Sequence, residues 1–71
     1  MPSHVALKGT VAEFDPHVGL GTVRASDGRE LLFHCTQLLD GTRTIDVGTL
    51  VRFDVVAGHA GKWEAARVEK L

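Results

Sequence analysis

His34 and Cys35 are the side chains in this sequence that come closest to a catalytic pair. A thiol and an imidazole act as nucleophile and base when they reach each other and a third group orients the base. The two residues are adjacent in a segment typical of a β-strand, so we expect their side chains to point to opposite faces. No third orienting group is evident in the sequence. The pair therefore does not predict covalent catalysis.

Other arrangements that could carry chemistry are weak. The four histidines and the single cysteine lack the spacing of a zinc site, so we expect no bound metal. Gly19-Leu20-Gly21 could approach a phosphate, but it lies in a predicted strand and not before a helix. We therefore expect a non-enzymatic protein that needs no cofactor.

Size and charge narrow the remaining classes. A chain of 71 residues, 44% hydrophobic and 24% charged, is typical of one small globular domain. Eight Lys and Arg residues against nine Asp and Glu residues give a net charge of −1. Phosphate binding usually leaves a basic balance, although one charged face can lie within a neutral total.

The sequence also predicts where the protein resides. No apolar run approaches the roughly 18 residues of a membrane helix, so we expect no membrane association. Met1-Pro2-Ser3-His4 has neither the basic nor the apolar region of a secretory signal. Cys35 has no intramolecular disulfide partner, and a lone thiol favours a reducing compartment. We expect a cytoplasmic protein.

Five segments are predicted to be strands, each bounded by turn residues. Asp15-Pro16 ends the first of them, and Ser26-Asp27-Gly28 is the strongest hairpin signal in the chain. The predicted strands cover residues 5–14, 19–24, 31–35, 49–56 and 62–68, with one helical turn over 36–39 and a loop over 40–48.

Three hairpin-linked strands, a longer connection and two further strands follow the order of a Greek-key barrel. We predict an all-β fold, a small five-stranded antiparallel barrel of the OB type, as a single domain over residues 1–71. Closing the sheet removes its exposed edges. The predicted core consists of Val11, Val23, Leu31, Phe33, Val51, Phe53, Val55 and Val68.

Several motifs resemble those of the bacterial cold-shock proteins, over residues 7–71 and with nearly the same spacing. The matching segments are Lys8-Gly9-Thr10-Val11, Phe14-Asp15, the alternating Gly19, Gly21 and Val23, the strand Leu31-Leu32-Phe33-His34-Cys35, residues 48–56, and Glu64-Ala65-Ala66-Arg67-Val68. In the family, the last of these segments is Gln-Ala-Ala-Asn-Val.

The resemblance implies binding of single-stranded DNA or RNA, with successive bases stacked on aromatic rings of the first three strands. Every base has a π-face, so this mechanism needs no sequence match. Here the family's histidine is retained as His34, but most of the rings are replaced. The replacing residues are Glu13 on the first strand, Leu20 and Thr22 on the second, Leu32 and Cys35 on the third, and a residue near Thr42 in the long loop.

The size of this loss predicts weak binding. Stacking contributes about 1–3 kcal/mol per base, so losing four or five rings removes on the order of 5 kcal/mol after non-additivity is allowed for. That corresponds to roughly three orders of magnitude in affinity. Glu13 adds a carboxylate where a base or a phosphate would lie.

Trp63, the only tryptophan, has two interpretations. It packs against the barrel rim with its N–H in water, or it is a relocated stacking platform with His59 and Lys62 beside it. Phe14 is expected to be half-buried. The candidate base contacts are His34, Phe14, Leu20, Leu32 and Trp63, and the candidate backbone contacts are Lys8, Arg24 and Lys62.

The same face supports an alternative from another class. Val18, Leu20 and Leu32 would form an exposed apolar patch, and such a patch can mark a partner surface. A net charge near zero makes association easier. The alternative is a small barrel that binds a protein partner or forms a homodimer through Leu20 and Leu32. A binder of structured RNA, using shape and charge, is a further possibility.

Overall fold

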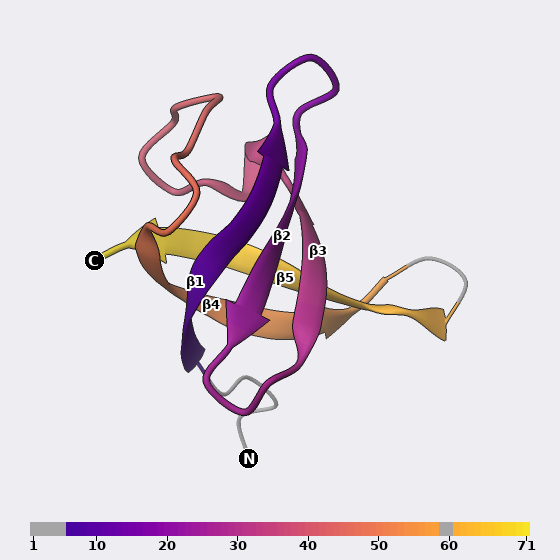
Figure 1. Cartoon of the computed structure of the whole chain (residues 1–71). Helices are drawn as coiled ribbons and strands as arrows, with labels where there is room; N and C mark the ends of the chain where they lie inside the picture. The colour runs from indigo at the N-terminus through magenta and orange to yellow at the C-terminus, as the bar shows by residue number, and fades with distance from the viewer. Residues whose placement is uncertain (1–5, 59–60) are drawn as a thin grey trace.

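The computed structural model describes residues 6–58 and 61–71. The segment Met1-Pro2-Ser3-His4, the first residue of the predicted strand over residues 5–14, and His59 lie outside these ranges. The strands are confirmed, with bounds within two residues of those predicted (Figure 1). They are β1 (Ala6–Asp15), β2 (Leu20–Ala25), β3 (Glu30–His34), β4 (Leu50–Ala57) and β5 (Trp63–Lys70), and a 3-10 helix η1 (Cys35–Gln37) follows β3.

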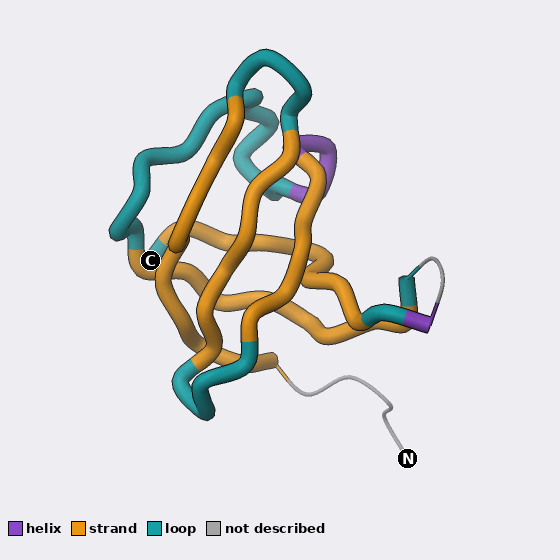
Figure 2. Tube along the Cα trace, turned by 45° about the vertical axis from the view of Figure 1, so that its right-hand side comes forward, coloured by secondary structure: helices purple, strands orange, loops and turns teal. Residues whose placement is uncertain are grey.

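The strands close into a barrel in the order β1-β2-β3-β5-β4. β1 pairs with β2 on one side and with β4 on the other. These two pairings are antiparallel, and so are those of β2 with β3 and of β4 with β5. The contact that completes the barrel, between Leu32 of β3 and Glu64 of β5, is parallel. The turn between β1 and β2 lies at the opposite end of the barrel from the turn between β2 and β3 (Figure 2).

The interior is filled by the side chains that alternation predicted. Val55 is the exception among the predicted core residues, since it is only half-buried. Residues in the loops and on β2 and β5 complete the core. The buried hydrophobic residues are Val11, Val23, Ala25, Leu31, Phe33, Leu38, Ile45, Val51, Phe53, Ala65 and Val68.

Phe33 fixes which face of β3 points outward. Its ring lies so close beneath β2 that a Cβ on Gly21 would be 2.7 Å from two ring carbons. Phe14 is half-buried, as predicted, and its ring stacks on that of Phe33 with centroids 6.0 Å apart. Because neighbouring strand residues alternate, Leu32 and His34 must then face outward.

Arg67 has an unusual backbone for a long side chain. Its φ is 53°, in the left-handed region that Gly and Asn tolerate best. The position lies within a register shift between β4 and β5, and the Arg67 N–H donates to Gln37 Oε1 at 3.2 Å. The side chain has one ion pair, with Asp54 at 3.5 Å, and is 72% exposed. Such a pair contributes little, so the strained backbone is poorly compensated.

Arg67→Asn should therefore stabilise the barrel. We expect the free energy of unfolding to rise by about 1 kcal/mol, because Asn adopts a positive φ at a lower cost than Arg. Urea denaturation followed by Trp63 fluorescence measures the change. Arg52→Asn is the control, since Arg52 lies on β4, is not among the positive-φ residues and pairs with Glu69. A decrease in stability for Arg67→Asn would show that its contacts outweigh the strain.

Candidate nucleic-acid interface

The outer face of β2 and β3 carries four of the eight candidate residues, Leu20, Arg24, Leu32 and His34. Both strands alternate strictly, so Gly21 and Val23 of β2 and Phe33 of β3 are buried while their neighbours face outward. The outward residues oppose one another in three cross-strand pairs, Leu20–His34, Thr22–Leu32 and Arg24–Glu30.

Leu32 is the central residue of this face. Its side chain is 45% exposed and lines three hollows. The first, of about 210 Å³, also involves Glu13, Phe14 and Leu20. The second, of about 310 Å³, involves Leu20, His34 and Glu64. Leu20 and Leu32 thus form the apolar patch that the sequence predicted.

Asp15 marks the edge of this patch, and Val18, the third residue predicted for it, lines none of these three hollows. Val18 is 59% exposed and lies in the turn between β1 and β2. Asp15 ends β1, where its Cα pairs with that of Leu20, and it lines the first hollow. With Glu13 beside it, this end of the face carries two carboxylates. It is therefore unfavourable for a phosphate chain.

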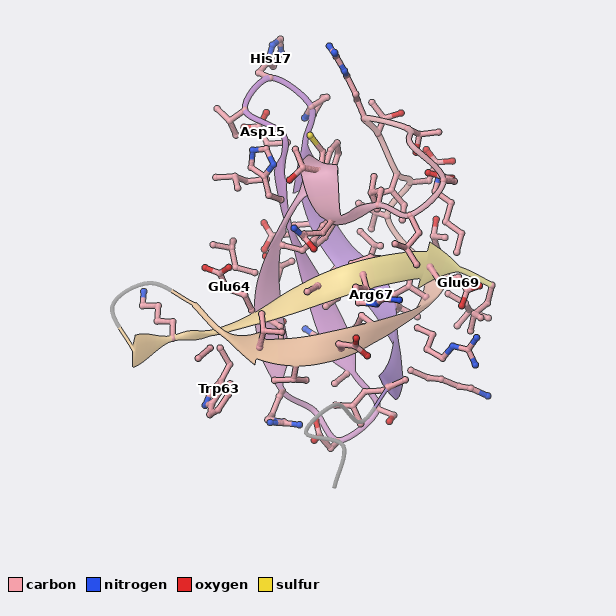
Figure 3. All side chains as sticks on the ribbon, turned by 180° about the vertical axis from the view of Figure 1, so that it is seen from behind. Asp15, His17, Trp63, Glu64, Arg67 and Glu69 are labelled. Atoms are coloured by element: carbon pink, nitrogen blue, oxygen red, sulfur yellow. The ribbon has the colours of Figure 1, made fainter. Side chains whose placement is uncertain are left out.

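The third hollow is a groove between β3 and the start of β5. Its volume is about 730 Å³, and Leu32 and Trp63 contribute apolar walls. Trp63 is 57% exposed, so its ring is not sealed into the core. Figure 3 shows Trp63 and Glu64 on opposite sides of β5, with Asp15 and His17 far away at the β1–β2 turn. The charged lining residues are Arg29, Glu30, Lys62 and Glu64.

Ion pairs hold two of the four charges in this groove. Arg29 Nε donates to Asp27 Oδ2 at 2.8 Å, and Arg24 donates to Glu30 Oε2 at 2.8 Å. The backbone N–H of Arg29 is the main cause that holds the pKa of Asp27 below its usual value, and the guanidinium adds to it. Within residues 6–58 and 61–71, Lys62 has no ion pair.

The three predicted backbone contacts do not converge. Lys62 lines the groove beside Trp63, whereas Lys8 and Arg24 line a separate shallow hollow of about 290 Å³. Arg24 is also engaged by Glu30. Sequence reasoning missed Arg29 and Glu64 as groove residues. The hairpin signal before Arg29 was available, but the β3–β5 contact that brings Glu64 there is not a local feature.

His34 is exposed and Cys35 packs against the core, yet their side chains approach each other. β3 ends at His34 and Cys35 begins η1, where strand alternation no longer applies. Cys35 Sγ lies 4.0 Å from His34 Nδ1. The same Nδ1 accepts the backbone N–H of Thr36 at 3.2 Å and lies 3.0 Å from the Thr36 hydroxyl. Thr36 thus orients the exposed imidazole of His34, which is the residue that caps the start of η1.

Within residues 6–58 and 61–71, no group of three or more His, Cys, Asp or Glu side chains could hold a metal ion. No helix there is long and apolar enough to cross a bilayer.

A closed five-stranded barrel with a hollowed outer face on β2 and β3 is an OB-type architecture, a class that binds oligonucleotides and oligosaccharides on this face. Residues 7–71 match the family model described as the "'Cold-shock' DNA-binding domain". The chain belongs to the cold-shock domain family.

Individual relatives agree with this assignment. The cold shock-like protein CspC of Bacillus cereus is 33% identical over 66 residues, which cover 92% of this chain and 100% of that protein. The cold shock protein CspC of Bacillus subtilis is 34% identical over 64 residues, or 89% and 96% of the two chains. Among solved structures, Drosophila Unr CSD456 superimposes with a TM-score of 0.80 at 30% identity. That match covers 97% of this chain and 28% of the longer one.

Proposed function

We propose that this chain is a non-enzymatic, cold-shock-like protein that binds single-stranded DNA or RNA, more weakly than typical relatives. The observation that supports the proposal most is the groove beside the binding face, where Trp63 and Lys62 meet Leu32. We also infer a cytoplasmic setting, which the free and half-buried thiol of Cys35 favours.

Base contact would come from the outward residues of β2, β3 and β5. His34 offers an exposed imidazole, Leu20 and Leu32 offer apolar surface, and Trp63 offers a ring. Phe14 can contribute only a ring edge, since it is half-buried against Phe33.

Electrostatic attraction would be small. Of the eight Lys and Arg residues, five are in ion pairs, namely Arg24, Arg29, Arg52, Arg67 and Lys70. Exposed pairs can open at little cost, but each frees a carboxylate together with the cation. The strand would therefore gain few phosphate contacts.

This charge distribution predicts binding that depends only weakly on salt. With one or two phosphate contacts, the logarithm of the association constant should fall against the logarithm of salt concentration with a slope of about −0.7 to −1.4. This slope is measured by titrating the protein with thymine-rich and mixed-sequence strands of seven nucleotides at several salt concentrations, with amide shifts as the readout. If a single strand at about millimolar concentration and low salt shifted no amide signal of β2, β3 or the residues around Trp63, nucleic-acid binding would be refuted.

Restoring one ring should restore affinity. Glu13 is exposed on β1, at the position of the family's strand-one tryptophan, so Glu13→Trp should fold normally. We expect about 5- to 150-fold tighter binding of a thymine-rich strand, from a stacking gain of about 1–3 kcal/mol. Fluorescence anisotropy of a labelled strand measures the change.

Glu13→Gln separates the ring from the charge. It removes the carboxylate without adding an aromatic surface, so it should improve binding much less than Glu13→Trp. Equal gains for both variants would mean that repulsion, and not the missing ring, weakens binding on this face.

A second candidate function is docking of a protein partner or a second copy on the Leu20–Leu32 patch. The supporting observation is that these side chains are 38% and 45% exposed next to Glu13 and Asp15, an environment that disfavours a phosphate chain. A small apolar patch bordered by charges can be a partner surface.

For the homodimer version of this candidate, we expect concentration-dependent sedimentation of the free protein. Leu20→Ser should abolish it, because Leu20 belongs to the patch but does not line the Trp63 groove. Leu50→Ser is the matched control, since Leu50 is 60% exposed and lies elsewhere, at the start of β4. A clean monomer at high concentration contradicts the homodimer.

A further inference from the structure

The aromatic rings of this chain are distributed very unevenly between core and surface. The sequence has three Phe, one Trp and no Tyr. Phe33 and Phe53 are each 1% exposed, and Phe14 is stacked on Phe33. Trp63 is 57% exposed and begins β5, beside the outer face of β3. Of these rings, it alone stands largely in solvent.

The groove next to this ring has the dimensions of a small-molecule site. Its volume of about 730 Å³ falls within the range of roughly 300–1,000 Å³ that ligand pockets occupy. The hollows around Leu20 measure about 210 and 310 Å³. A planar ring system is therefore accommodated better beside Trp63 than on the face between β1 and β3.

The charges of the groove suit a neutral ring with one attached phosphate. Arg29 is held by Asp27 and Glu30 is held by Arg24, which leaves one cation, Lys62, and one carboxylate, Glu64, without ion pairs among the described residues. Lys62 immediately precedes Trp63, so its ammonium group can reach a phosphate attached to a stacked base. A highly charged ligand would find no second uncommitted cation among the described groove residues.

We propose that this groove is a one-base site, in which a single unpaired nucleobase stacks on Trp63 against Leu32 and its phosphate binds Lys62. The inference rests on the proposed function and specifies where and how the strand is held. The site is the principal anchor of the strand. Glu13 and Asp15 lie on β1, on the far side of β2 from the groove, so the neighbouring bases gain little by extending across β2 onto β1.

The number of bases that contribute gives a direct test. One DNA strand of seven nucleotide positions carries a single thymine at its centre and abasic sites at the other positions. A second strand of the same length carries thymine at every position. Because Trp63 is the only tryptophan, its fluorescence reports stacking without a label. We expect both strands to quench it, with affinities that differ by no more than about sevenfold, the number of registers open to a one-base site. A multi-base face would make the full strand hundreds of times tighter and overturn the proposal.

Substitutions test the ring itself, with a labelled thymine strand and anisotropy as readout. Trp63→Ala should weaken binding about 5- to 150-fold, and Trp63→Phe should retain most of it. Leu50→Ala, a change of another exposed apolar residue, should leave affinity unchanged. Amide spectra of each variant establish that the barrel is intact.

The outcomes separate the two proposals. If the wild-type protein binds both strands and Trp63→Ala binds as well as wild type, the one-base site is wrong and the proposed function stands. If the wild-type protein binds neither strand at millimolar concentration, nucleic-acid binding itself is refuted and the one-base site is refuted with it.

Discussion

The close approach of β2 to the Phe33 ring determines the rest of the barrel. Gly21 is buried, and a Cβ there would collide with both the Phe33 ring and the carbonyl oxygen of Glu13. Three strands are thus locked in register around one aromatic side chain. Since the side-chain period of a strand is two residues, this single contact assigns every neighbouring residue on β2 and β3 to the core or to the surface.

That assignment explains how the fold and the binding surface can change independently. Core packing fixes the inward residues of β2 and β3, but it places little demand on Leu20, Thr22, Leu32 and His34 on the other side. Replacing a surface ring by an aliphatic residue removes a base platform without opening a cavity. The interior of this strand pair is therefore constrained by packing, whereas its outward residues are free to vary.

The fold was largely predictable because the signals that specify it are local. Alternation marks the strands, and Asp15-Pro16 and Asp27-Gly28 mark two turns. The prediction errors lie at positions where strand alternation ends or becomes irregular. Alternation was carried one residue too far at Cys35, where η1 begins, and Val55 is less buried than its place in the pattern suggests.

The candidate site was less predictable because it depends on the contact that closes the barrel. Leu32 and Glu64 are far apart in sequence and meet only through the parallel bridge between β3 and β5. No local pattern places Trp63 beside Leu32.

Charge pairing and ring placement together determine what kind of ligand this surface can hold. Most of the Lys and Arg side chains of the whole chain are paired with neighbouring carboxylates, so long-range attraction to a polyanion is small. Stacking has no such dependence on net charge, because the ring and the base interact through apolar surface and π-faces. A protein of this composition that binds a nucleic acid must therefore rely on the rings that remain exposed. In this chain the ring that we propose as the anchor is Trp63, at the start of β5.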